Sequence, residues 1–318
     1  GKMLKPIRHM FPPLVTGIVV LMIGISLLKV GFKYAGGGVW LMNNKPEIFA
    51  NWHHLTIAGT VLIVALFTNL KGRGMVSAAS ILIGIIAGFI VAAMLGEVRW
   101  DKIAAAGWFA FPMPLQYGVD FVWGAVILML FMSIVTTIET IGDISATTMG
   151  GANREATDKE LSGGIMADGV GTAFASIFNA MPNTSYSQNA GLVAFTGVIS
   201  RHVGTVAGVI LILLGLFPKL GGIIAAMPDS VIGGAAIIMF GLIAGAGIKL
   251  ISKSEMSQRN ILILALSLSF GIGLYAFPEF VAHVPDLGIK LGLLLTTGLI
   301  PAGLLAFILN ATLPKKNK

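Results

Sequence analysis

Two carboxylates lie in a stretch of sequence that is otherwise apolar enough to cross a bilayer. Glu139 and Asp143, in "TTIETIGDISATT" (136–148), end an apolar run that begins near Phe121, and their i, i+4 spacing places them on one helix face. A carboxylate at the centre of a membrane helix costs about 2.5–3.5 kcal/mol on insertion scales. This cost predicts a polar functional centre, for which Asp168 in the next, glycine-rich segment is a third candidate. The plainer alternative is that Asp143 and Asp168 lie near the cytoplasmic ends of their segments and meet water.

A second polar element interrupts the apolar pattern at "NAMPNTSYSQNAG" (179–191). Pro182 and its Asn, Ser and Thr neighbours cannot continue a helix smoothly, and irregular backbone at membrane depth persists only where protein or a water-filled cavity covers it. If residues 184–189 are extended, Tyr186 and Gln188 face the same way. An aromatic face beside a carboxamide suits a planar heterocycle with N–H and C=O groups. A turn of small polar residues is the alternative.

The composition assigns the chain to the membrane. Of 318 residues, 56% are hydrophobic and 11% charged, and the mean hydropathy is +0.89, which is typical of a polytopic membrane protein and not of a soluble domain. The formal net charge of +7 comes from basic residues at segment ends, without the basic patch and interleaved aromatics of a nucleic-acid binder. With no cysteine, disulfides and thiolate metal sites are excluded.

The apolar runs predict the membrane topology. Long runs occur at about 13–31, 55–70, 75–96, 121–143, 203–217, 229–249, 260–277 and 287–311. Two weaker, glycine-interrupted segments between 162 and 199 bring the expected crossings to ten. Basic residues cluster at both ends of the chain and in the loops expected on the same side. The positive-inside rule therefore predicts an integral membrane protein with both ends cytoplasmic.

The acidic run and the broken segment together carry a family resemblance. The segment "QNAGLVAFTG" (188–197) resembles the signature of the nucleobase–ascorbate transporter family at all five defined positions: Gln/Glu/Pro, Asn, any residue, Gly, four of any kind, Thr, then Arg/Lys/Gly. Upstream, "ETIGDISAT" (139–147) is similar to the eighth span of the purine permeases of this family. The resemblance extends from about residue 5 to the C-terminus and includes 11–31 and 214–243.

The resemblance implies an all-α polytopic membrane protein, part of a seven-plus-seven inverted repeat with a core and a gate domain. Residues 11–110 would form the first part of the gate, 111–218 half of the core with the substrate site, and 219–318 the second part of the gate. The first four spans would be absent, since 11–31 is similar to the fifth. A short strand is expected within the broken tenth span, around Tyr186.

The family also implies roles for individual residues at the substrate. Glu139 is similar to the carboxylate that hydrogen-bonds the nucleobase, and Gln188 to the second substrate contact, with Asn189 supporting it. Tyr186 occupies a position often held by an aromatic side chain that lies against the base.

Other positions are implied to serve coupling or support. Asp143 is similar to the residue tied to proton coupling, and Asp168 to an acidic residue of the ninth span that supports the site. Gly191, Thr196 and Gly197 are the remaining fixed positions of the signature and are expected to support it too. Neither a catalytic residue nor a metal ligand is implied, and the proton is the only coupling ion.

The activity implied by the resemblance is proton-coupled uptake of a purine nucleobase across the bacterial cytoplasmic (inner) membrane by alternating access, and not an enzymatic reaction. Gln188 with a closing Gly197 resembles the xanthine and urate branch, so xanthine is the first choice and urate the second. A uracil permease of the same family, a transport-incompetent fragment and, remotely, an intramembrane aspartyl protease are the alternatives. The expected partners are the purine, the lipid bilayer and, as an open question, a second copy of the chain. No nucleic acid is expected.

Overall fold

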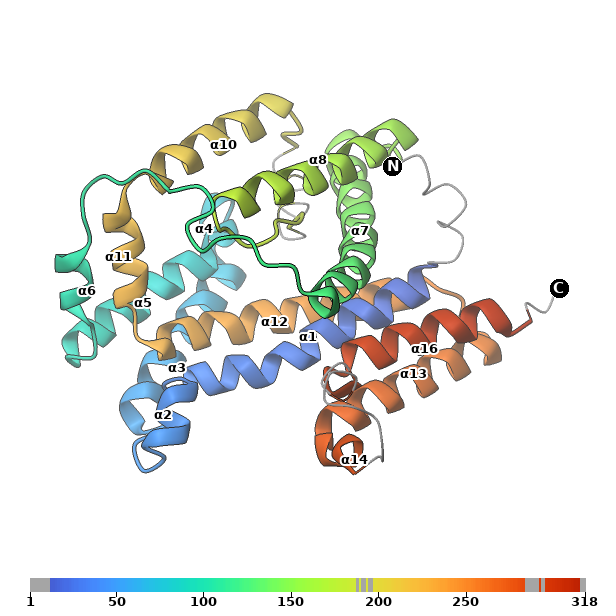
Figure 1. Ribbon diagram of the computed structural model, residues 1–318, viewed down its shortest axis with the longest axis horizontal. Coiled ribbons are helices and arrows are strands. Elements are labelled where there is room, and N and C mark those ends of the chain that lie inside the picture. The colour runs from blue at the N-terminus through green and yellow to red at the C-terminus, as the bar shows by residue number, and fades with distance from the viewer. Residues whose placement is uncertain are drawn as a thin grey trace. The chain divides into compact units, whose positions relative to one another are not determined.

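The computed structural model describes residues 12–186, 189, 193, 197–283, 292 and 295–314, and over these residues the regular structure is entirely helical (Figure 1). The predicted strand is therefore not confirmed. Residues 181–186 form neither helix nor strand, and Gln188 lies outside the described residues. Two compact units are described separately below. Gate and core domains are defined by how they move during transport, so the predicted domain division stays a prediction.

One unit comprises Phe32–Phe121 and Thr140–Ala235. Besides parts of helices shared with the other unit, it contains α2 (Val39–Asn44), α3 (Trp52–Lys71), α4 (Met75–Ala78), α5 (Ser80–Met94), α6 (Trp100–Ala105), α8 (Asp158–Ile177), α10 (Arg201–Gly215) and α11 (Pro218–Ala226). Helices α3 and α5 pack side by side, and α6 packs on α11. The α3–α5 approach is close, because a Cβ atom at Gly84 would lie 2.9 Å from the Cβ atom of Ala65.

The buried core of this unit gathers apolar side chains from α3, α5, α11, the start of α12 (Asp229–Ser252) and the connection between α5 and α6. Its members are Ile57, Val61, Ala92, Val98, Ala226, Val231 and Ala235. Burial of such side chains removes apolar surface from water or lipid contact and fixes α3 against α5.

The other unit comprises the described parts of Lys2–Gly31, Val122–Glu139 and Ala236–Lys318. It contains most of α1 (Pro13–Ala35) and α12, all of α13 (Gln258–Ala276), α14 (Pro278–Ala282) and α16 (Leu299–Thr312), and the first part of α7 (Trp123–Ala152). Helices α13 and α16 pack side by side. The buried core consists of Leu14, Val15, Ile18, Leu21, Met22, Ile251, Ile263, Ala302 and Ala306.

Within this second unit, α1 and α12 run antiparallel along a glycine seam. Three α1 glycines spaced seven apart face three α12 residues spaced seven apart in reverse order: Gly17 faces Ile251, Gly24 faces Ala244, and Gly31 faces Ile237. A Cβ atom at Gly24 would lie 2.7 Å from both the Cα and the Cβ atom of Ala244. Glycine is therefore required for the backbones to approach this closely, as is common between membrane helices.

Four described helices, α1, α3, α12 and α13, are long and apolar enough to cross a membrane. A fifth crossing arises if α10 and α11, which meet at a bend of 80°, are counted as one broken span. The four long helices coincide with predicted runs, and each of their ends lies within four residues of the predicted one. The total of ten crossings stays a prediction.

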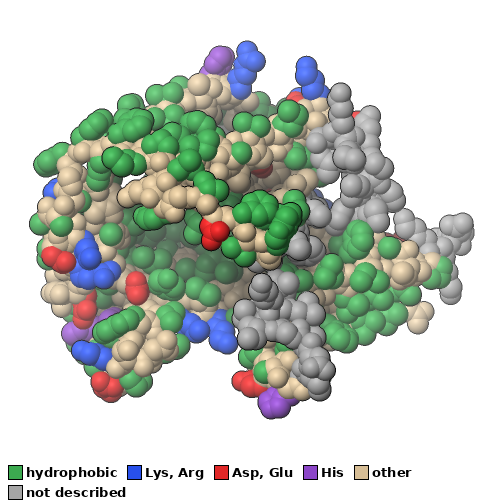
Figure 2. All heavy atoms as spheres, viewed as in Figure 1, with side chains coloured by type: hydrophobic (Ala, Val, Ile, Leu, Met, Phe, Trp, Pro, Cys, Tyr) green, Lys and Arg blue, Asp and Glu red, His purple; other side chains and the backbone are tan. Residues whose placement is uncertain are grey.

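Hydrophobic side chains cover much of the face shown in Figure 2, where charged side chains are few. The same character holds elsewhere over the described residues, since Leu70 and Met94 are 78% and 80% exposed. A surface of this kind would be costly in water and is suited to lipid.

Candidate functional site

Helix α7 carries the predicted acidic pair well inside the helix and not at its end. The helix has 30 residues and continues to Ala152, beyond the predicted run of 121–143. Thr140 and Asp143, one helical turn apart, are 2% and 9% exposed. Asp143 therefore does not simply meet open water. Glu139 is half-buried.

Two short hydrogen bonds join α7 to α8 and to the irregular segment 181–186. The hydroxyl of Thr140 donates to Asp168 Oδ2, with 2.6 Å between the oxygens. The hydroxyl of Ser185 donates to Asp143 Oδ2, also at 2.6 Å. Oxygen–oxygen distances of 2.5–2.7 Å are typical of charge-assisted bonds to a carboxylate. We refer to Thr140, Asp143, Asp168 and Ser185 as the acid–hydroxyl cluster.

The segment 181–186 has a second attachment on α8. The hydroxyl of Thr172 donates to Asn183 Oδ1 at 2.9 Å, and the backbone N–H of Asn183 donates to Thr172 Oγ1 at 3.2 Å. Packing is tight here, because a Cβ atom at Gly171 would lie 2.8 Å from Asn183 Nδ2. The segment is thus held at Asn183 and again at Ser185, with Tyr186 following at once.

Tyr186 and Asn189, two of the predicted substrate contacts, are both exposed, Tyr186 by 48%. A backbone hydrogen bond of 3.0 Å from the N–H of Asn189 to the carbonyl oxygen of Tyr186 holds the two residues near each other. Gln188, Gly191 and Thr196 lie outside the described residues.

The last residue of the signature, Gly197, has a positive φ of 70°, and its N–H donates to the carbonyl oxygen of Val193 at 2.8 Å. A left-handed backbone conformation favours glycine over other residues. The closing glycine therefore has a local structural reason, in addition to the role that the family implies.

Hydroxyl groups, and not fixed cations, are the partners of Asp143 and Asp168. Over the described part of the chain, neither carboxylate forms an ion pair with Lys, Arg or His. Nor does any group of three His, Cys, Asp or Glu side chains in this part of the chain have a geometry that could hold a metal ion. The cluster can therefore accept hydrogen bonds from N–H groups or exchange a proton.

Sequence reasoning missed Thr140 and Ser185. Each of them hydrogen-bonds one of the predicted acids, and the two hydroxyl oxygens lie 3.5 Å apart. The only signal available was their position, Thr140 directly after Glu139 and Ser185 directly before Tyr186.

The loop before α8 is a solvated structure remote from this chemistry. Thr157 caps α8 in a reciprocal capping box with Glu160, and Arg154 forms an ion pair of 2.6 Å with Glu160. The hydrogen bond from Arg154, followed by those from Thr157, holds the pKa of Glu160 well below its usual range.

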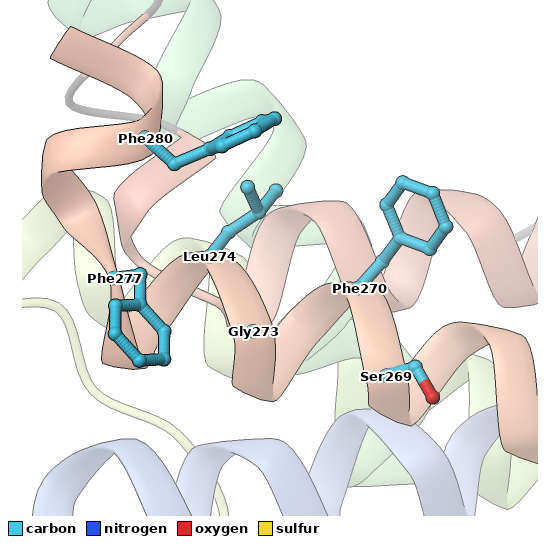
Figure 3. Close-up of a pocket in the computed structure, with 6 residues that line it drawn as sticks. All are labelled: Ser269, Phe270, Gly273, Leu274, Phe277 and Phe280. Carbon is cyan, nitrogen blue, oxygen red and sulfur yellow. The ribbon is translucent and has the colours of Figure 1, made fainter. Parts of the chain in front are cut away.

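An apolar groove on the unit that contains α13 has a different character (Figure 3). It is lined by Ser269, Phe270, Gly273, Leu274, Phe277 and Phe280. Among the described residues that line it, Ser269 alone has a polar side chain, and one hydroxyl cannot pair the several N–H and C=O groups of a heterocycle. The acid–hydroxyl cluster is the better candidate site.

Comparison with known proteins identifies a family and several named relatives to which this chain is similar. The family model Xan_ur_permease, described as Permease family, matches residues 2–280. A provisionally named purine permease from Clostridium perfringens is 39% identical over 310 residues, covering 98% of this chain and 67% of the relative.

Two further relatives have more specific names. Xanthine permease XanP from Escherichia coli is 34% identical over 322 residues, covering 100% of this chain and 68% of XanP. Uric acid permease PucJ from Bacillus subtilis is 34% identical over 311 residues, covering 97% of this chain and 68% of PucJ. The chain thus spans about two thirds of the length of these relatives.

Proposed function

Because this chain belongs to the Permease family, the nucleobase–ascorbate transporters, we propose that it serves the proton-coupled uptake of a purine nucleobase across the bacterial cytoplasmic membrane. Membership makes it a membrane transporter and not an enzyme, which sets aside the intramembrane protease. Movement of a core against a gate, with both chain ends in the cytoplasm, is the mechanism that we propose.

The observation that carries the proposal is the acid–hydroxyl cluster at the irregular segment. Ser185, which is bonded to Asp143, directly precedes Tyr186. A nucleobase needs a flat surface for its ring and acceptors for its N–H groups, and an ionised carboxylate is a strong acceptor. Tyr186 offers the surface, and Glu139 on α7 offers the carboxylate.

Each remaining residue has a part in this proposal. Gln188, supported by Asn189, pairs with the edge of the base, because a carboxamide both donates and accepts. Asp143 takes up the coupling proton, and Asp168 holds α8 to α7 through Thr140.

Xanthine is the proposed substrate and urate the second choice. Relatives that cover nearly this whole chain are named xanthine and uric acid permeases, and the signature closes with Gly197. A uracil carrier of the same family remains the rival, with Gln188 and Gly197 arguing against it.

The test is uptake of labelled xanthine by cells that lack their own purine carriers and produce this chain, with and without a protonophore. We expect uptake that the protonophore abolishes and that excess urate reduces more than excess uracil. Glu139→Gln should weaken xanthine binding about 10-fold or more, as for loss of a charge-assisted hydrogen bond worth about 1.5–3 kcal/mol. The matched control is Glu155→Gln, in the exposed loop before α8. Unchanged xanthine binding in Glu139→Gln, or xanthine uptake that the protonophore does not reduce, would contradict the proposal.

A further inference from the structure

The acid–hydroxyl cluster contains two strong links and one weak one. Ser185 to Asp143 and Thr140 to Asp168 are both 2.6 Å, whereas Ser185 Oγ and Thr140 Oγ1 are 3.5 Å apart. Hydrogen bonds between hydroxyl groups are usually 2.5–3.0 Å long. The two hydroxyls therefore almost complete a continuous path between the carboxylates, and the gap between them interrupts it.

We propose that Ser185 and Thr140 bridge Asp143 and Asp168, so that the two acids share one proton when the gap between the hydroxyls closes. The inference rests on the proposed function, because it concerns the proton that Asp143 would take up. It makes Ser185 and Thr140 positioning residues, which act through the acids.

The transfer leaves each of the two hydroxyls with one O–H bond. The Ser185 hydroxyl, which donates to Asp143 in the structure, first turns toward Thr140. A protonated Asp143 then gives its proton to Ser185 Oγ, the Ser185 proton passes to Thr140 Oγ1, and the Thr140 proton passes to Asp168 Oδ2. One O–H bond is broken at Asp143 and one is formed at Asp168, while each hydroxyl keeps one proton. After the transfer the Ser185 hydroxyl points to Asp143 and the Thr140 hydroxyl points to Ser185, so both have to rotate before the next transfer.

The gap can change because its two sides belong to different kinds of structure. Thr140 lies inside α7 and is almost completely buried, whereas Ser185 belongs to the irregular segment 181–186. The residue after Ser185 is Tyr186, the proposed surface for the nucleobase. A ligand that draws the segment toward α7 would shorten the gap, so binding of the base would open the path for the proton.

The charged groups around the cluster favour a proton that is shared between Asp143 and Asp168. Besides Asp143 and Asp168, the described ionisable groups on the elements that meet at the cluster are Glu139 on α7, Tyr186 on the segment, and Asp158, Lys159 and Glu160. The last three lie in the first turn of α8, two helical turns or more before Asp168. The stretch around Val193 and Ile199, which contacts α7 at Gly151, brings no ionisable side chain among its described residues. Neither acid has an ion-paired cation there, so a single proton distributed between two nearby acids reduces their mutual repulsion.

The experiment is an infrared titration of the purified chain in liposomes, following the C=O stretching band of protonated carboxyl groups, together with the pH profile of xanthine uptake. The test variants are Thr140→Val and Ser185→Ala. The matched control is Thr148→Val, because Thr148 is also a buried threonine of α7 but its hydroxyl donates to Ile144 O of its own helix at 2.8 Å. Thr140→Ser keeps the hydroxyl and serves as the rescue.

We expect the titration midpoint to move by about one pH unit or more, corresponding to a tenfold change in the proton equilibrium, in Thr140→Val and in Ser185→Ala. It should stay at the wild-type position in Thr148→Val and Thr140→Ser. Midpoints that coincide in Thr140→Val, Ser185→Ala and the control would overturn the bridge.

Xanthine binding, measured in parallel, separates this inference from the proposed function. If the wild-type chain binds no xanthine, the proposed function fails, while the infrared midpoints still decide on the bridge. If Ser185→Ala binds and accumulates xanthine with the wild-type pH profile, the bridge fails and the proposed function stands.

Discussion

Replacing Thr172 by valine should loosen the irregular segment without touching the acids. The substitution removes the hydroxyl that donates to Asn183 Oδ1 at 2.9 Å and accepts from the Asn183 N–H at 3.2 Å. A neutral hydrogen bond contributes about 0.5–1.5 kcal/mol net, and this pair is partly exposed, so both together contribute about 1–2 kcal/mol. If binding needs the ordered segment, that energy converts to an affinity about 5- to 30-fold weaker for xanthine.

The assay compares the dissociation constant for xanthine and the thermal unfolding of Thr172→Val with those of Thr205→Val. The hydroxyl of Thr205 donates to the carbonyl oxygen of Arg201 in its own helix, α10, at 3.2 Å. A double-mutant cycle with Asn183→Ala should be non-additive, because both changes remove the hydrogen bond from the Thr172 hydroxyl to Asn183 Oδ1. Affinity and unfolding temperature equal to those of the Thr205 variant would refute the idea that this attachment positions the site.

The α1–α12 seam predicts that Gly24→Val lowers the unfolding temperature by overpacking against Ala244, at a cost of about 1–3 kcal/mol or more. Gly241→Val is the control and should change the unfolding temperature little, because a Cβ atom there meets nothing within 4 Å. Equal effects of the two substitutions would contradict the seam. For the capping box, the lowered pKa of Glu160 means that its contribution is complete above the ordinary value of 4.5 and is lost as the pH falls below it. The stability difference between wild type and Glu160→Gln, measured in parallel with Arg154→Gln, should therefore be constant from pH 8 to about 5 and shrink below pH 4.5; a difference that grows on acidification would contradict this sign.

Hydropathy predicted the long helices well, because a segment that crosses lipid has to be apolar along its whole length. The runs at 13–31, 55–70 and 229–249 correspond to α1 (Pro13–Ala35), α3 (Trp52–Lys71) and α12 (Asp229–Ser252). The same cost argument singled out Asp143 and Asp168, and both belong to the acid–hydroxyl cluster.

The hydroxyl members of that cluster could not be found in the same way. Serine and threonine in a helix usually bond to a carbonyl of the preceding turn, as Ser145 and Thr148 do on α7. Thr140 lies on the same helix and bonds to α8 instead. Whether such a hydroxyl bonds to its own helix or to another one depends on the residue that packs beside it in the tertiary structure. The local sequence does not show which residue that is. Ser185 was likewise one of several small polar residues in a break.

The seam between α1 and α12 also constrains how the lengths of these helices can evolve. At 3.6 residues per turn, deleting one residue from α1 would rotate everything after it by about 100°. Gly24 and Gly31 would then turn away, and larger side chains would meet the backbone of α12. Insertions and deletions that survive selection should therefore fall in the connecting loops. Within the helices, they should change the lengths of α1 and α12 together and by seven residues each.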